Sequence, residues 1–297
     1  MDRKNKWIKY AIGLSLLLGG CMSHSNAPKE VEDQYERVQD YKGEGYRLTD
    51  GAANAKVAEE NREEVEKAVM AFFMENYETE VEIHNLVGNK DGVTVFVEST
   101  GPVHFYTYAI VPFHHETDRI SVGVVRTQEG EVERGIREGL YRLLFEEEFK
   151  KLDSYLESVV SEEKVVGRTV ESLQNVGGSG YMTPYYFMSS LNSDKAIKPV
   201  YELYMKNHQT SIETMKQAYD GSLFQADNLR INIMLFMGEE DVQPSEEIME
   251  RIARDLKERN DFPKGTYRVA INDNGVHKES FEGFKDNSIE QEVIKGE

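Results

Sequence analysis

Four closely spaced segments with the alternation of β-strands constrain the fold more than any other feature of this sequence. They are residues 81–87, 93–98, 103–111 and 120–124. The first two are joined by the turn GNKDG, and Gly101 and Pro102 precede the third. Turns of this kind connect neighbouring antiparallel strands, so the pattern predicts a four-strand antiparallel meander.

Helical spacing flanks the meander on both sides. Val65, Val69 and Phe73 recur at helical intervals within residues 52–76, and residues 131–149 carry a second apolar stripe. Strand and helix patterns continue after residue 163. We therefore predict an α+β fold: a helix, the four-strand antiparallel meander and a helix, followed by a second mixed α/β half.

The third segment is bulky on both of its faces. Val103, Phe105, Ala109 and Val111 alternate with His104, Tyr106, Tyr108 and Ile110. One face covers the helices, because antiparallel sheets bury at least one side. The other face either packs against the second half of the chain, which we favour, or forms a binding surface that includes His104, Tyr106 and Tyr108.

The amino-terminal residues predict export and lipid anchoring. A basic start is followed by eleven uncharged residues, 10–20, which is shorter than the roughly 20 needed to span a bilayer. The run ends in Leu-Gly-Gly-Cys at 18–21, and Cys21 is the only cysteine. This motif resembles the bacterial lipoprotein signal, in which the cysteine is acylated and the chain is cut before it. The alternatives are an ordinary signal peptide and a simple anchor helix.

The net negative charge of the chain restricts the classes of molecule that it can bind. The 297 residues include 54 acidic and 35 basic side chains, a formal net charge of −19. Phosphate backbones bind through Lys and Arg, so nucleic acid is excluded as a partner. The expected partners are the membrane, through lipid on Cys21, and a protein of the cell envelope.

The pattern predicts five segments along the chain. They are a lipoprotein signal peptide at 1–20, a lipid-anchored tether at 21–45, an α+β domain at 46–162, a second α+β domain at 163–280, and a loose polar tail at 281–297.

A glycine-rich loop is the most suggestive local motif. Gly177, Gly178, Ser179 and Gly180 could present consecutive backbone N–H groups to an anion. The loop lacks the Lys-Ser/Thr of a P-loop, and Tyr181 replaces the last glycine of a nucleophile elbow, so a tight interdomain turn is favoured. If the loop binds a ligand, Tyr181, Tyr185 and Tyr186 are the expected walls.

The sequence predicts no catalytic residue, no cofactor and no metal site. His114 and His115 are the only adjacent histidines, and neighbouring residues on an extended chain point to opposite faces, which does not suit one metal ion. The acidic runs lack the spacing of a calcium loop.

Four stretches resemble a family of uncharacterised lipoproteins of Gram-positive bacteria, a domain of unknown function. They are YKGEGY at 41–46, GPVHFY at 101–106, QNVGG at 174–178 and INDN at 271–274. The resemblance implies a location on the outer face of the cytoplasmic membrane and supplies no activity. We expect a binding or interaction protein of the cell envelope. The alternatives are an envelope hydrolase with a non-contiguous active site and, less favoured, a solute-capturing transporter subunit.

Overall fold

The antiparallel meander forms the centre of the first half of the chain. The computed structural model describes residues 34–114 and 119–296. Strand β3 (Gly92–Ser99) pairs with β2 (Val81–Asn89) on one side and β4 (Tyr106–His114) on the other, all antiparallel. The fourth expected strand is reduced to β5 (Arg119–Ile120), because η1 (Val122–Val124) turns the chain around Gly123.

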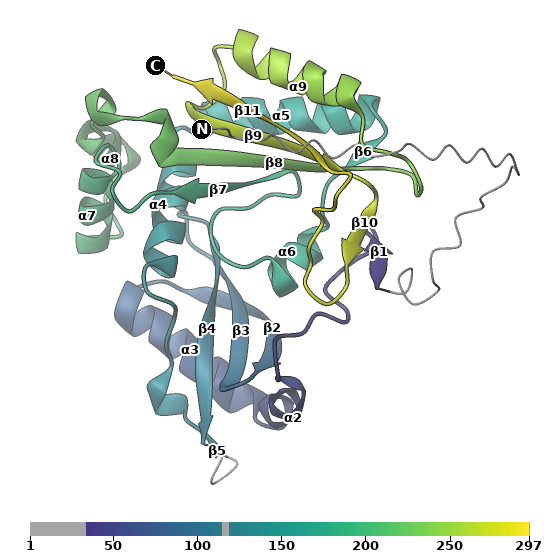
Figure 1. Cartoon of the computed structure of the whole chain (residues 1–297). Coiled ribbons are helices and arrows are strands. Elements are labelled where there is room, and N and C mark those ends of the chain that lie inside the picture. Colours follow the sequence, from purple (N-terminus) through teal and green to yellow (C-terminus); the bar gives the residue numbers. More distant parts are fainter. Residues whose placement is uncertain (1–33, 115–118, 297) are drawn as a thin grey trace, which may run out of the picture. The chain divides into compact units, whose positions relative to one another are not determined.

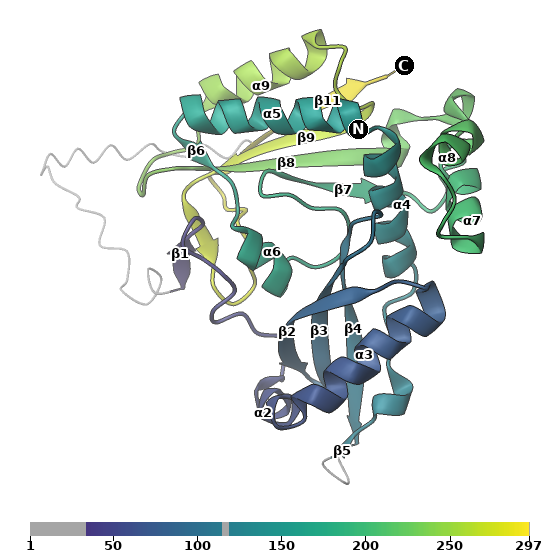
Figure 2. The same cartoon turned by 180° about the vertical axis from the view of Figure 1, so that it is seen from behind.

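Two helices cover one face of the meander. They are α2 (Ala52–Glu60) and α3 (Arg62–Tyr77), which Figure 2 shows in front of the strands. We expected one helix here, but Asn61 separates the two, and its side-chain amide donates to the Val57 carbonyl at 2.8 Å. The apolar stripe that includes Val65 is buried against the valines of β3.

A mixed sheet forms the second half. Its central strand β8 (Leu229–Met237) runs parallel to β9 (Gly265–Asn272), which pairs antiparallel with β11 (Ile289–Lys295). Along the other edge of β8 lie β7 (Tyr186–Ser190) and β6 (Val165–Val166). Helices α5 (Glu146–Glu162) and α9 (Glu246–Glu258) lie side by side on one face of this sheet (Figure 1).

Shorter elements complete the described chain. They are β1 (Tyr35–Arg37), which pairs with β10 (Gly275–His277), α6 (Val170–Val176), α7 (Lys198–Lys206), α8 (Ile212–Ala218), η2 (Gly221–Leu223) and η3 (Ala226–Asn228). The last part of the expected tether is folded, because Val38 and Tyr41 are fully buried. Residues 1–33, including the expected signal peptide and Cys21, lie outside the described residues.

The predicted loose tail was wrong for residues 289–295. These residues pair with β9 over seven positions, and Val293 is buried in the main core. The expected boundary near residue 163 does not separate two cores either. Helix α5 precedes it but packs on the sheet that follows it, where the Tyr155 hydroxyl donates to Asp255 of α9 at 2.8 Å.

Helix α4 (Glu131–Leu144) joins the two halves and is buried along most of its length. Gly135 and Gly139, one turn apart, let it approach the chain before β4. An added Cβ would lie 2.8 Å from the Phe105 ring at Gly135 and 2.7 Å from the His104 carbonyl oxygen at Gly139. Both positions therefore require glycine for this packing.

Glu138 fastens the other side of α4 to the second half. Its side chain is fully buried, and its two carboxylate oxygens accept the backbone N–H groups of Tyr181 at 3.0 Å and Ser190 at 2.9 Å. Burial raises the pKa of Glu138 to about 7, although Arg134, Arg137 and the two N–H groups favour the charged form.

We predict that strand β11 contributes to stability through Val293. Val293→Ala removes buried methyl groups, so the free energy of unfolding should fall by about 2 kcal/mol. The neighbouring Ile294 is 57% exposed, and Ile294→Ala should change it by less than about 0.5 kcal/mol. Urea denaturation of both variants checks this, and equal effects would contradict the placement of β11.

We also predict a pH dependence that originates at Glu138. Between its ordinary pKa of 4.5 and about 7, the folded protein holds a proton on Glu138 that the unfolded chain releases. Stability should therefore fall as pH rises through this range, by up to about 3 kcal/mol. Glu138→Gln does not titrate, so the wild-type free energy of unfolding should decline relative to this variant. A constant difference from pH 4.5 to 7.5 would refute the prediction.

Candidate functional site

The outer face of the meander, opposite α2 and α3, is covered at one end of β4 and open at the other. Tyr106 is buried with Leu173 of α6 and Met182, and its backbone N–H and carbonyl each bond Gly180 at 2.9 Å. Tyr108 and Ile110, further along the same face, are only half-buried. The face is therefore packed against the second half of the chain at Tyr106 and is partly open at Tyr108 and Ile110.

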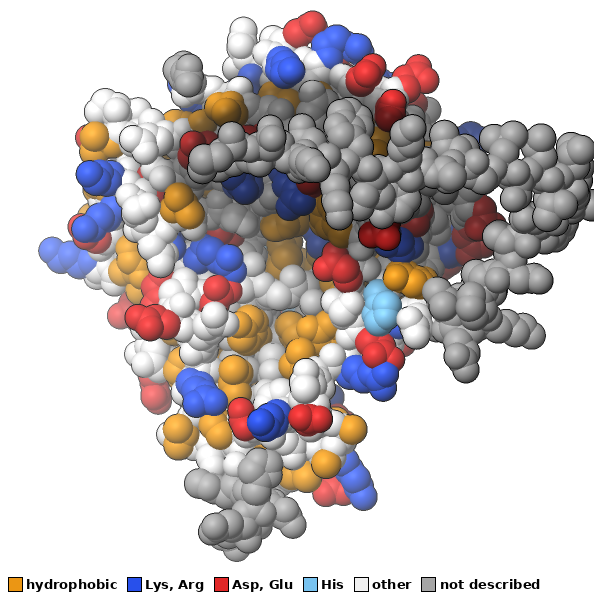
Figure 3. Space-filling model, in the orientation of Figure 1, with side chains coloured by type: hydrophobic (Ala, Val, Ile, Leu, Met, Phe, Trp, Pro, Cys, Tyr) orange, Lys and Arg blue, Asp and Glu red, His pale blue; other side chains and the backbone are white. Residues whose placement is uncertain are grey.

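The open part is a groove of about 470 Å³, which we call the outer-face groove. Its apolar lining comprises Tyr46, Leu48, Phe96, Tyr108 and Ile110. Figure 3 shows hydrophobic side chains gathered at the centre of this face, surrounded by charged ones. The Phe96 ring is held between Tyr46, edge-on at 6.0 Å, and Tyr108 at 6.3 Å. These aromatic contacts fix the groove floor.

Charged and polar groups complete the lining of the groove. They are Thr49, Asn89, Lys90, Asp91, Thr94, Arg126 and the backbone of Gly178. Lys90 and Arg126 are exposed, and neither forms an ion pair with another described side chain. The groove thus offers two cations beside an aromatic floor in a strongly acidic protein.

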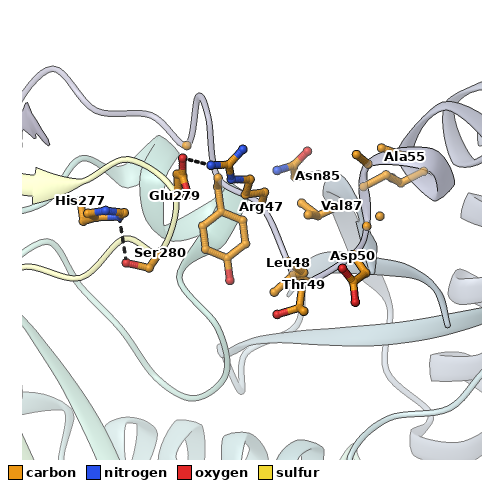
Figure 4. A pocket seen from close by; sticks show the side chains of 16 residues that line it. Arg47, Leu48, Thr49, Asp50, Ala55, Asn85, Val87, His277, Glu279 and Ser280 are labelled. Atoms are coloured by element: carbon orange, nitrogen blue, oxygen red, sulfur yellow. Dashed lines mark hydrogen bonds and ion pairs between the residues drawn. The ribbon is translucent and has the colours of Figure 1, made fainter. Parts of the chain in front are cut away.

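A second hollow, which we call the edge cavity, adjoins the groove and shares Tyr46, Leu48 and Thr49 with it. It measures about 680 Å³ and lies along the free edge of β2 (Figure 4). Asn85 and Val87 of β2 form one side, and the loop that carries His277 and Glu279 forms the other. Residues 46–49 are therefore the wall between the two hollows.

The described residues of the edge cavity do not form a complete catalytic arrangement. Arg47 is already paired with Glu279. The Ser280 hydroxyl and His277 Nδ1 are 3.3 Å apart, which is a nucleophile-and-base pairing in principle. No described carboxylate bonds the other imidazole nitrogen, so the group that orients the base in a catalytic triad is missing from the described residues.

His104 belongs to a separate cluster centred on Glu98. The Glu98 carboxylate accepts from His104 Nε2 at 2.6 Å, His84 Nε2 at 2.9 Å and Gln174 Nε2 at 3.1 Å. Burial alone would raise the pKa of Glu98, but these three hydrogen bonds outweigh it and lower the pKa to about 2. The cluster ties β2, β3 and α6 together and does not line either hollow.

The glycine loop passes beside the buried carboxylate of Glu138, but the N–H group that bonds this carboxylate belongs to Tyr181, the residue after the loop. Gly180 has φ +118°, and a Cβ there would lie 2.3 Å from Glu138 Oε2. Gly177 ends α6, Ser179 bonds Thr107 at 3.4 Å, and Gly178 has open space beside it and reaches the groove. The loop is chiefly a structural clamp on α4.

The three tyrosines that follow the loop lie mostly in the core. Tyr181 and Tyr186 are buried, and their hydroxyls bond Arg142 at 2.9 Å and Asp153 at 2.8 Å. Arg142 and Asp153 are themselves 3.2 Å apart, so the four side chains form one network. Tyr185 is half-buried. Of the expected binding residues, the structure brings Tyr108 and Gly178 together at the groove.

Tyr46 and Arg126 line the groove but were not predicted to do so. Tyr46 precedes the first expected helix, and Arg126 follows the strand that was expected to continue to Val124. Phe96 was the available signal, because it shares the bulky outer face with Tyr108. Their convergence depends on contacts between distant segments.

Two further observations bear on a cofactor and on the membrane. In the parts of the chain that the structure describes, no three His, Cys, Asp or Glu side chains are arranged to hold a metal ion. Among those same residues, no helix combines the length and apolar character needed to cross a bilayer.

Comparison with known proteins gives a family but no activity. No curated protein sequence matches the chain. The fold is similar to the crystal structure of a DUF1672 family protein from Staphylococcus aureus subsp. aureus Mu50, with a TM-score of 0.71. The two are 19% identical, and the match covers 89% of this chain and 99% of that chain. The family model matches residues 28–296, and the chain therefore belongs to the family of proteins of unknown function DUF1672.

Proposed function

We propose that this protein is a lipid-anchored binding protein on the outer face of the cytoplasmic membrane, and that the outer-face groove holds its partner. The observation that carries the binding function is the aromatic floor of the groove beside two cations, Lys90 and Arg126, that form no ion pair with another described side chain. Exposed apolar surface rimmed by polar groups is typical of an interaction site.

The lipid anchor rests on the amino-terminal motif. Acylation of Cys21 and removal of residues 1–20 would leave two or more acyl chains on one residue. A single chain gives only reversible membrane binding, whereas two anchor a protein stably. The compact unit Gln34–Glu297 follows Cys21 by about a dozen residues of sequence.

The groove chemistry indicates the kind of partner. Phe96, Tyr108 and Ile110 favour an apolar side chain, and Lys90 and Arg126 favour a carboxylate close to it. We therefore propose a segment of an envelope protein that carries an apolar residue next to an acidic one. The acidic body as a whole repels anionic lipid headgroups, which favours a partner in solution over the membrane surface.

The hydrolase alternative has weaker support. It requires convergent acid and base groups in a cleft. The nearest arrangement among the described residues is Ser280 with His277, which lacks the orienting carboxylate. We therefore retain the binding function.

We predict that Cys21→Ala abolishes lipidation. The thiol is the atom that receives lipid, so the variant should lose incorporation of a palmitate analogue and keep residues 1–20, as read by intact mass. Met22→Ala is the matched control, because it leaves the thiol in place and should be labelled and processed normally. Acyl labelling that persists in Cys21→Ala would refute the anchor.

We predict that the groove is where the partner binds in the native bacterium. A photo-crosslinking benzoylphenylalanine at position 108 should give a discrete protein adduct. The same residue at position 223, where Leu223 is 45% exposed and outside the groove, should give none.

Charge reversal tests the electrostatic part of the proposal. Arg126→Glu should lower the yield of the position-108 adduct at least fivefold, because it repels an acidic partner segment. Arg254→Glu on α9, where the side chain is 58% exposed, should leave the yield unchanged. Equal yields from positions 108 and 223, or no effect of Arg126→Glu, would contradict this assignment of the groove.

A further inference from the structure

A third hollow, which we call the aromatic cavity, lies in the half of the protein built on the mixed sheet. It measures about 300 Å³ and shares no lining residue with the groove or the edge cavity. Rings from six residues surround it: Tyr141, Phe145, Phe149, Tyr219, Phe224 and Phe262. They come from α4, the α4–α5 junction, α5, the segments around η2 and the loop before β9.

The aromatic wall is fixed by its surroundings. The Tyr141 hydroxyl donates to the buried Asp194 carboxylate at 2.5 Å, and Asp194 also accepts the Ala196 N–H at 3.0 Å. The Phe145 and Tyr219 rings meet edge to face at 5.1 Å. Arg259 covers a face of Phe262 at 4.1 Å from the ring centre. A wall held in this way loses little entropy when a ligand binds.

Two opposite charges line the same cavity without pairing. Glu148 lies in the first turn of α5 and is half-buried, and Lys264 precedes β9 and is exposed. Among the described side chains, neither forms an ion pair, with the other or with any third residue. Most other charges in this half have a partner, as Arg251 does with Glu162 and Glu163.

We propose that the aromatic cavity binds a free hydrophobic amino acid. The rings would take its side chain, Glu148 its ammonium group and Lys264 its carboxylate. An anion and a cation that have no ion-pair partner among the described residues, beside an apolar hollow, are complementary to a small zwitterion with an apolar body. A volume at the lower end of the usual range for ligand sites suits a molecule of this size.

Each simpler ligand leaves one observation unexplained. A hydrocarbon or neutral aromatic compound would leave both charges without a partner. An organic cation would use the rings and Glu148, but Lys264 would repel it. An apolar carboxylate would use Lys264 and leave Glu148 unpaired. The free amino acid accounts for the rings and both charges.

The test is calorimetric titration of the full chain with three free amino acids of increasing size: L-leucine, L-phenylalanine and L-tryptophan. We expect saturable binding of at least one of them. For that amino acid, the analogue without the carboxylate and the analogue without the ammonium group should each bind at least tenfold more weakly.

Three variants assign the binding to this cavity. Glu148→Gln should weaken binding of the amino acid about tenfold and leave the analogue without an ammonium group unaffected. Lys264→Met should also weaken binding of the amino acid about tenfold, and it should leave the analogue without a carboxylate unaffected. Gly221→Leu should abolish binding by filling the cavity, because a Cβ there meets only the Tyr219 ring at 3.6 Å. Gly101→Leu, at a glycine with nothing within 4 Å, is the matched control and should bind normally.

The outcomes that overturn the proposal are distinct. No heat of binding with any of the three amino acids refutes it. Tighter binding of either analogue than of the amino acid assigns the cavity to an organic cation or an apolar anion instead. Binding that survives in Gly221→Leu places the ligand elsewhere. None of these results depends on the outer-face groove or its partner.

Discussion

Helix α4 is the element on which the rest of the structure depends, and the burial of a single carboxylate explains why. Glu138 lies in the interior, where an unsatisfied charge costs several kcal/mol. Two backbone N–H groups, from Tyr181 and Ser190, satisfy it, and both belong to the second half of the chain. The opposite side of α4 contacts the meander through Gly135 and Gly139. One helix therefore joins the two sheets: it contacts the meander through two glycines and the second half through a buried carboxylate.

This joint also determines where the outer face of the meander is open. The glycine loop just before Tyr181 lies across β4, where Gly180 pairs with Tyr106, and α6 before the loop covers the Glu98 cluster. Beyond Gly178 the chain no longer follows the strand, so Tyr108 and Ile110 remain accessible. The groove thus lies over the part of β4 that the glycine loop does not cover.

The sequence predicted elements whose signal is local and missed those whose partner is distant. The alternation of Val93, Val95 and Val97 and the apolar stripe from Val65 predicted the meander and a helical layer on it, but not the break at Asn61 or the shortening of the fourth strand. Strand β11 was missed because IEQEVIK has few apolar residues and is held by backbone pairing with β9. The glycine loop was interpreted as a tight turn in preference to an anion site. It lies beside Glu138, whose contact with the Tyr181 N–H, 43 residues away in sequence, was not identifiable. The outer face at Tyr108 was recognised as a possible binding surface, but Tyr46 and Arg126 were missed for the same reason, since they reach it only in the fold.

The position of a few cations beside aromatic walls explains why we consider the groove and the aromatic cavity to be binding sites. The chain has 54 acidic and 35 basic side chains, and many of the cations in its described part are paired with a carboxylate, as Arg251 is. A lysine without an ion-pair partner on an open surface does not indicate a binding site, because surface ion pairs contribute only about 0 to 1 kcal/mol to stability. Lys90 and Arg126 at the groove and Lys264 at the aromatic cavity differ because each lies beside a fixed aromatic wall. There, a bound anionic group is partly removed from water, and its attraction to the cation is correspondingly stronger. The same acidic surplus that disfavours nucleic acid and anionic lipid therefore leaves a few sites at which a carboxylate is favoured.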